Sequence, residues 1–306
     1  MPTPTVQFVT VAVATRNRQD TIEECLESLL VQDLPADRYE VIVVDDDSAD
    51  RTSDIVRRFV QDTAPVVRYV HQSYGGLAVA RNRAITDGRG DLICFLDDDA
   101  VATPGWLAAM AAAADRNPDV DCFGGRLLLR LEGPAPRTCG AESLGATLDL
   151  GDSEQTIERV KGSNMAMRRS AFERIGLFNP ALVWRGDEDN WLFRLHEDGG
   201  RVLYIPDALV WHRRTESDLR LRNLLKTRFG WGVGQVKYKR ETDVPFRPRV
   251  ELRNLRRDLA HAVRNRCTGG LLHAAVRIGA LWGGFTGELR KPRQSVPGLA
   301  QSQDAQ

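Results

Sequence analysis

Several features that would place this sequence in a well-marked class are missing from it. No CxxC pair occurs among its five cysteines, Cys25, Cys94, Cys122, Cys139 and Cys267. An odd and dispersed set argues against a disulfide framework or a zinc site and is typical of a reducing compartment. No run of about 18–20 unbroken apolar residues is present, so we expect no membrane span. The first apolar run lacks a basic region before it, so we expect no signal peptide.

Two phosphate-binding signatures are also missing. Neither GxGxxG nor GxxxxGK[ST] occurs, which disfavours a dinucleotide-binding Rossmann site and a P-loop. The charge is balanced, with 42 basic and 42 acidic residues, so no overall attraction to nucleic acid is expected. Residues 220–266 nevertheless carry fourteen Lys/Arg against four Asp/Glu. This basic part either faces phosphates, acidic lipid or a partner, or is a solvated helical surface.

The first third of the sequence alternates between two hydrophobic periods. Short apolar runs typical of buried strands occur at 9–14, 41–44, 66–69 and 92–96. Apolar residues at helical spacing occur between and after them, at 20–30, 50–60, 77–86 and 105–115. Strands that alternate with helices of this length predict βαβ units and a parallel sheet covered on both faces. The expected fold class is therefore α/β.

The pattern changes from about residue 120. We expect strands at 122–131, 201–205 and 208–212, and helices at 170–175 and 186–197. Beyond Leu219 the chain is predicted to be helical, with an interruption around Pro245 and Pro248. A helix to about Asn265 and an apolar helix at 271–285 should follow.

Acidic residues cluster directly after two of the predicted strands. Asp97, Asp98 and Asp99 follow the apolar run 92–96, and adjacent carboxylates need a positive partner when they are buried. Mg²⁺ or Mn²⁺ suits them, because these cations prefer oxygen ligands and share phosphate oxygens. We expect Asp97 and Asp99 on one side of an extended chain, both reaching one cation. Asp46, with Asp45, follows the second strand and could accept hydrogen bonds from a base or a ribose.

Two further junctions suit a nucleotide. The segment ATRNR places Thr15, Arg16 and Asn17 at the end of the first strand, either as a nucleotide anchor or as a simple helix cap. The segment GGLAVARN brings Gly76 and Arg81 together. Glycine lets the backbone approach a ligand closely, and arginine suits the recognition of phosphate.

The order of these motifs carries a resemblance. ATRNR, VVDDDS, GGLAVARN, FLDDD, GSNMAMRR, GDED and VWH together resemble the family 2 glycosyltransferases with the GT-A fold, over roughly residues 7–215. The resemblance implies that Asp46 contacts the nucleotide base and that Asp97 and Asp99 hold a metal and the donor diphosphate. It places Asp98 near the ribose, and Arg81 at the nucleotide with Gly76 in the preceding loop.

The resemblance also implies a catalytic base in an acidic pair at the start of a helix that ends in "RL". Here the segment is GDEDNWLFRL. Spacing from Arg194 selects Asp187 and Glu188, whereas residue identity selects Glu188 and Asp189. A carboxylate with a raised pKa can take a proton from an acceptor hydroxyl. We rank Asp189 and Glu188 close together, with Asp187 behind. Acids in a first helical turn also complement the helix dipole.

Two more residues match positions of the family. Asn164 in KGSNMAM matches the motif that lines the sugar pocket, and a turn residue before a strand is the alternative. His212 in LVWH matches a position that completes the metal shell in some GT-A enzymes, and an ordinary satisfied polar residue is the alternative.

The expected protein is thus an inverting, metal-dependent glycosyltransferase. It would use a nucleotide-diphosphate sugar, with UDP as the first choice and GDP or TDP as alternatives, and a hydroxyl acceptor on a glycan, a lipid-linked glycan or a small molecule. A nucleotidyltransferase acting on sugar phosphates, or a non-catalytic nucleotide-sugar-binding module, is the alternative. The first would usually carry a Gly-rich loop after strand one, which ATRNR lacks.

The expected organisation is a catalytic unit at 1–218, with a nucleotide-binding half at 1–118 and an acceptor and sugar half at 119–218. A basic and apolar helical extension at 219–290 and a disordered tail at 291–306 should follow. The extension either lies on the cytoplasmic face of a membrane, packs on the catalytic unit, or forms a homodimer. The expected location is cytoplasmic, and no nucleic-acid partner is expected.

Overall fold

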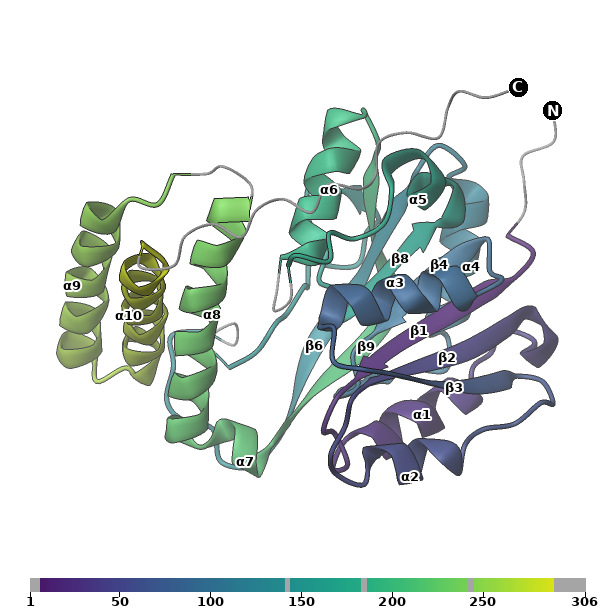
Figure 1. The fold of residues 1–306 in the computed structure, drawn as a ribbon, viewed down its shortest axis with the longest axis horizontal. Coiled ribbons are helices and arrows are strands. Elements are labelled where there is room, and N and C mark those ends of the chain that lie inside the picture. Colours follow the sequence, from purple (N-terminus) through teal and green to yellow (C-terminus); the bar gives the residue numbers. More distant parts are fainter. Residues whose placement is uncertain (1–5, 141–143, 183–185, 242–244, 289–306) are drawn as a thin grey trace.

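The computed structural model describes residues 6–140, 144–182, 186–241 and 245–288, and within these ranges the strands form one nine-stranded sheet (Figure 1). The strand order is β3-β2-β1-β4-β8-β6-β9-β5, and β7 pairs with β9. The strands are β1 (Val9–Thr15), β2 (Tyr39–Asp46), β3 (Val66–Gln72), β4 (Leu92–Leu96), β5 (Ala100–Ala102), β6 (Cys122–Glu132), β7 (Gln155–Thr156), β8 (Asn164–Arg168) and β9 (Val202–Thr215).

The sheet is parallel in its N-terminal half and mixed beyond it. Strands β3, β2, β1 and β4 all run in one direction. Strand β8 runs antiparallel to both β4 and β6, which returns β6 and β9 to the direction of the first four. The short strands β5 and β7 run antiparallel to β9. The predicted α/β fold with a mostly parallel sheet is confirmed.

Two hydrophobic clusters cover the two faces of the sheet. Alternate residues of a strand point to opposite faces, so Val11 and Val13 of β1 belong to one cluster and Ala12 to the other. The first cluster is covered by α1 (Ile22–Leu30), α2 (Thr52–Arg57) and α4 (Trp106–Arg116). The second is covered by α3 (Leu77–Asp87), α5 (Arg169–Ile175) and α6 (Asp187–Glu197).

Some predicted boundaries need correction. The region expected to hold two strands, 201–205 and 208–212, forms the single strand β9, and its partner β6 changes register between Gly125 and Leu127 to accommodate it. Helix α2 is shorter than the predicted 50–60. The acidic triplet is a turn between β4 and the unexpected strand β5, and not the extended chain that we predicted.

The C-terminal extension consists of helices packed beside the sheet. A short helix α7 (Glu216–Leu219) leads into α8 (Leu221–Glu241), followed by α9 (Pro248–Asn265) and α10 (Thr268–Glu288). Helix α9 begins at Pro248, as the predicted interruption requires. Glycines let α8 and α10 approach closely, since a Cβ on Gly232 would collide with the carbonyl oxygen of Val276. The predicted disordered tail lies outside the described residues.

A disulfide joins this extension to the catalytic unit. Cys139, in the loop after β6, is bonded to Cys267, which lies between α9 and α10, and the ring nitrogen Nε2 of His261 lies 2.8 Å from the sulfur of Cys139. The prediction from cysteine spacing, which disfavoured disulfides, is therefore wrong. The two cysteines are 128 residues apart in sequence, and no local pattern reports such a contact.

A helix that crosses a bilayer must be both long and apolar. Among the described ranges, no helix has both properties.

Candidate active site

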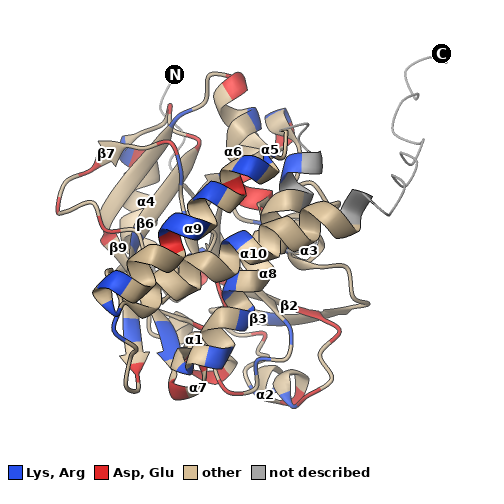
Figure 2. Ribbon diagram, turned by 90° about the vertical axis from the view of Figure 1, so that its left-hand side faces the viewer, with Lys and Arg blue, Asp and Glu red and all other residues tan. Residues whose placement is uncertain are grey.

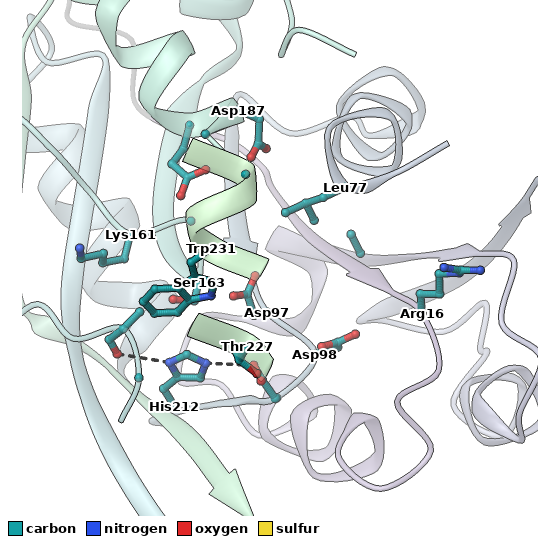
Figure 3. Close-up of a pocket in the computed structure, with 18 of the residues that line it drawn as sticks. Arg16, Leu77, Asp97, Asp98, Lys161, Ser163, Asp187, His212, Thr227 and Trp231 are labelled. Atoms are coloured by element: carbon teal, nitrogen blue, oxygen red, sulfur yellow. Dashed lines mark hydrogen bonds and ion pairs between the residues drawn. The ribbon is translucent and has the colours of Figure 1, made fainter. Parts of the chain in front are cut away.

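A pocket of about 850 Å³ opens at the carboxyl ends of β1, β2 and β4 (Figure 3). Most of the predicted site residues line it: Thr15, Arg16, Asp46, Gly76, Arg81, Asp97, Asp98, Asp99, Asp187, Glu188, Asp189 and His212. Ligands bind at this edge of α/β sheets because the strand ends leave a crevice there. Residues far apart in the sequence thus converge on one cavity.

The acidic triplet is held by arginines that our sequence reasoning missed. The Nε atom of Arg18 lies 3.1 Å from the Asp98 carboxylate, and a terminal nitrogen of Arg214 lies 3.2 Å from that of Asp99. Both arginines line the pocket. Arg18 stands in the same ATRNR segment as the predicted anchor residues, which was the available signal. Arg214 lies two residues after His212 on β9, and alternate residues of a strand share a face, so that spacing was the available signal.

The surroundings of Asp98 and Asp99 shift the pKa values of these two carboxyls in opposite directions. Burial raises the pKa of Asp98 to about 7, against the opposing attraction of Arg18. Burial would also raise the pKa of Asp99, but His212, Arg18 and Arg214 together hold it well below its usual range. Asp99 is therefore ionised under all ordinary conditions, and this part of the pocket keeps a fixed negative charge.

Asp97, Asp99 and His212 have the donor chemistry of a divalent-metal site. One ligand atom from each lies within 4.8 Å of the other two. The Nδ1 atom of His212 lies 3.3 Å from the carbonyl oxygen of Ala146, which can only accept, so Nδ1 carries a proton and Nε2 is the nitrogen that faces the acidic turn. Nε2 lies 3.2 Å from a carboxylate oxygen of Asp99 and 2.9 Å from a guanidinium nitrogen of Arg214. Carboxylate and imidazole are ligands that a divalent cation accepts, so these residues fit a bound cation.

The acids of α6 occupy three different environments. The helix starts after Gly186, which has a φ of 87° that favours glycine. Asp187 is fully buried and accepts a 2.8 Å hydrogen bond from Arg81. Glu188 lines the pocket, and burial together with the neighbouring charge of Asp187 raises its pKa to about 8. Asp189 is more exposed and lies 3.7 Å from Arg159.

Arg81 connects the acidic turn to α6. Its guanidinium is buried and donates to Asp187, to Asp97 at 3.3 Å and to the carbonyl oxygen of Gly162 at 2.9 Å. A side chain at position 162 would overlap this guanidinium, which explains the glycine of the KGSN segment. With these partners Arg81 fixes the separation between the two acidic groups.

The nucleotide side of the pocket is built around a short glycine turn. The Asp46 carboxylate accepts hydrogen bonds from the backbone nitrogens of Gly75 and Gly76, each at 2.8 Å. Asp46 thus shapes the turn that begins α3. The guanidinium of Arg16 stacks 4.2 Å from the ring centre of Tyr74. The charged and aromatic side chains here surround a surface that suits a base and a ribose.

Two predicted binding residues do not line the pocket. Asn17 has a φ of 54° and accepts from the backbone of Ala49, so it forms the turn between β1 and α1. Asn164 is fully buried and donates to the carbonyl oxygens of Arg126 and Ala208. Asn17 therefore neither lines the pocket nor caps α1, whose N-cap is Thr21, and Asn164 ties three strands together. Its neighbours Lys161, Gly162 and Ser163 line the pocket in its place.

The sequence matches the model of Glycosyl transferase family 2 over residues 10–176, which is more than half of the chain. The chain therefore belongs to this family and is a glycosyltransferase. This finding decides against the nucleotidyltransferase and the non-catalytic module. The matched range ends before α6 and before the whole helical extension.

Similar proteins agree with this assignment. Glycosyltransferase AglE of Haloferax volcanii is 28% identical over 236 residues, which cover 76% of this chain and 75% of that protein. The glucosyl-dolichyl phosphate glucuronosyltransferase of Haloferax volcanii is 26% identical, over 69% of this chain and 71% of its own. The mannosyltransferase PcManGT of Pyrobaculum calidifontis has a similar structure, with a TM-score of 0.61 and 22% identity over 92% of this chain and 88% of that one. The fold is thus the GT-A fold.

Proposed function

We propose that this glycosyltransferase moves a sugar from a nucleoside-diphosphate sugar to an acceptor hydroxyl and inverts the anomeric carbon. One observation carries the proposal. The metal-type donor set of Asp97, Asp99 and His212 and the carboxyl of Glu188 line the same pocket. The pocket therefore combines a place for a diphosphate with a place for a proton acceptor.

The donor nucleotide would lie against the glycine turn. Asp46 and Arg16 would face the base and ribose, with Thr15 and Asp98 between them and the diphosphate. The similar mannosyltransferase was solved in complex with GDP-Man and Mn²⁺, which supports a nucleotide sugar as donor. UDP, GDP and TDP carry the same diphosphate, and this part of the chain shows no feature that selects one of them.

Asp97, Asp99 and His212 would hold Mg²⁺ or Mn²⁺. A cation bound there would neutralise charge that develops on the diphosphate leaving group. Arg18 and Arg214 already face the carboxylate of Asp99, so part of the positive charge comes from the chain itself.

Glu188 is the proton acceptor that we select among the three acids of α6. Its carboxylate takes the proton of the acceptor hydroxyl, while the hydroxyl oxygen forms a bond to the anomeric carbon. The bond from that carbon to the diphosphate oxygen breaks in the same step, and its electron pair leaves with the nucleoside diphosphate. A pKa of about 8 suits this task, because a base works best when its pKa lies near the operating pH.

Asp187 serves a different purpose in this proposal. It is fully buried and paired with Arg81, so it is poorly placed to receive a proton from a substrate. Together, Asp187 and Arg81 position the first turn of α6 relative to the acidic turn. Asp189 would remain an exposed acid at the rim of the pocket.

The test is release of nucleoside diphosphate from UDP-, GDP- and TDP-sugars by the purified protein with Mn²⁺. We expect one class of donor to be consumed and expect EDTA to stop the reaction. Proton NMR of the first product formed would give the anomeric configuration. Retention of configuration would contradict the single displacement, and no release from any donor would contradict the assigned donor class.

An acceptor carried on a lipid is supported by the outer face of the extension. Exposed apolar side chains follow helical spacing on α9 and on α10, and Figure 2 shows arginines recurring along α9. The apolar residues are Leu252, Leu259 and Val263 on α9 and Leu271, Ile278, Trp282 and Phe285 on α10. An apolar stripe beside arginines suits an anionic bilayer surface. We call these seven residues the outer apolar face. One similar protein is named for a dolichyl phosphate substrate.

Vesicle flotation tests this contact. The protein should float with vesicles that contain anionic lipid and remain below neutral ones. Replacing Trp282 and Phe285 with serine should lower the bound fraction severalfold, since each aromatic ring contributes buried apolar area. Equal flotation of the double variant would contradict the membrane contact. A wild-type dimer that these substitutions dissociate would show that a second copy covers this face.

A further inference from the structure

The C-terminal extension forms one wall of the catalytic pocket. Six of the lining residues lie on α8, namely Leu224, Thr227, Arg228, Trp231, Gly234 and Gln235. Their spacing of three and four residues places them on one face of the helix. The predicted boundary at residue 218 had left this segment outside the catalytic unit. We call these six residues the α8 wall.

Glycine 234 leaves an open space in this wall. Glycine is among the least favourable residues in a helix interior, so each one there calls for a reason. Gly232 has a packing reason, because a Cβ there would strike the backbone of α10. Gly234 is buried and lines the pocket, yet a Cβ there would meet nothing within 4 Å. The space beside it is a space in the pocket, which a substrate can occupy.

Trp231 provides a flat surface next to that space. The guanidinium carbon of Arg228 lies 3.6 Å from its ring centre, so the indole is held by a cation–π contact. Gln235 lies one turn further along the same face and can both donate and accept hydrogen bonds. A broad aromatic surface beside an amide and a vacant position suits the apolar face and the hydroxyl groups of a sugar ring.

The position of the α8 wall favours the acceptor over the donor. In Figure 3, Trp231 and His212 lie to the left of Asp97, and Arg16 lies to the right. The nucleotide is proposed to lie on the Arg16 side. In a single displacement the acceptor must approach the anomeric carbon opposite to the leaving diphosphate. The wall across from the nucleotide is therefore where the acceptor enters.

We propose that the α8 wall is the acceptor subsite and that it binds a pyranose ring, which stacks on Trp231 and extends over Gly234. This inference rests on the proposed function, because it presupposes a donor on the opposite side of the pocket. It names the acceptor as a carbohydrate, whether free or carried on a lipid.

The chain offers a matched pair of variants for the test. Gly234 lines the pocket, whereas Gly230, one turn earlier, is exposed and lies outside the lining, and a Cβ at either position meets nothing within 4 Å. Gly234→Leu and Gly230→Leu therefore gain the same helix propensity, and only the first fills the proposed subsite. Both variants should unfold at or above the wild-type temperature.

The probes are p-nitrophenyl hexopyranosides as acceptors, with UDP-glucose and GDP-mannose as donors and Mn²⁺ present. Gly234→Leu should lower kcat/KM for the acceptor at least about tenfold, and Gly230→Leu should leave it within about twofold of wild type. Trp231→Ala should raise the acceptor KM about tenfold, and Trp231→Phe should recover most of the loss. The Kd of UDP or GDP, measured by calorimetry with Mn²⁺, should stay unchanged in all four variants.

Three results would overturn the inference. They are an unchanged acceptor KM in Gly234→Leu, a nucleotide Kd that rises with the acceptor KM, and no pyranoside that either accepts sugar or quenches the Trp231-dependent fluorescence. The second would assign the α8 wall to the donor. Failure of the proposed function gives a different result, because the wild-type protein would then release no nucleoside diphosphate from any donor.

Discussion

The two walls of the pocket are built in opposite ways. The sheet wall, made of the acidic turn, Arg18, Arg81, His212 and Arg214, is dense in charge, and most of its groups are paired at 3.3 Å or less. The α8 wall presents a single arginine, Arg228, stacked on the indole of Trp231, together with an amide and a glycine with open space beside it. Charges fixed in a low-dielectric cavity suit phosphate and catalysis, whereas a flat surface with free volume suits the recognition of a sugar. In the proposed function, chemistry and selectivity would therefore lie on different parts of the chain.

The largest effect is expected when the Asp99 carboxylate is removed from the sheet wall. Asp99→Ala should lower Mn²⁺-dependent turnover by about 10³-fold or more, because the loss of several kcal/mol of charge stabilisation has that effect. Nucleoside-diphosphate release measures it, and Asp62→Ala, an exposed loop position, is the control. Turnover at the wild-type level would refute the role of the acidic turn.

The next largest effect concerns stability. Arg81→Met would leave Asp187 buried without its cation and should cost about 3–5 kcal/mol of unfolding free energy. Removing both charges with Arg81→Met and Asp187→Leu should recover most of that loss. Urea unfolding measures both, with the exposed Arg83→Met on the same helix as control. If the double variant is as unstable as the single one, the pair does not act as a unit.

Turnover is expected to depend on pH through the ionisation of Glu188. Its pKa of about 8 means that the carboxyl is protonated at lower pH and becomes a base as the pH rises through 8. Turnover should therefore rise with pH and level off above about 8. Glu188→Gln should lower kcat by about 10²–10⁴-fold and remove this rise. Asp189→Asn should have little effect, and a larger loss in Asp189→Asn than in Glu188→Gln would exchange the two roles.

The smallest effect is expected from reducing the disulfide that joins the loop after β6 to the C-terminal extension. The Cys139–Cys267 disulfide closes a loop of 128 residues, so its reduction should lower the unfolding free energy by about 2–4 kcal/mol. Thermal unfolding with and without dithiothreitol measures the change, and the Cys139→Ser, Cys267→Ser double variant should show no response to the reagent. An unchanged wild-type transition would mean that the bond does not hold the extension.

The sequence predicted the sheet wall better than the α8 wall. Local hydrophobic periods predicted β1, β2, β3 and β4, and the polar residues after them had to meet because parallel strands end at one edge. The position of α8 was not predictable in this way. Its lining residues share the pocket with groups more than a hundred positions away, and helical spacing alone does not distinguish a pocket face from a solvated one.

Individual residues show the same limit. Asn164 stood in the expected motif, yet strand pairing buried its amide between Arg126 and Ala208. Arg214 stood in no motif, yet the pairing of β9 with β5 brought it to Asp99. A side chain's role depends on which way its strand faces, and that direction is fixed by pairing partners elsewhere in the chain.

The amino-acid order by itself determined the alternation of strands and helices, the place of the acids at the strand ends, and through them the family. Only the tertiary structure decided which acid of α6 is buried against Arg81, that Cys139 meets Cys267, and that α8 closes the pocket. The first set depends on neighbours a few residues apart, whose periodicity is visible along the chain. The second depends on groups more than a hundred residues apart, which only the packed sheet and helices bring together.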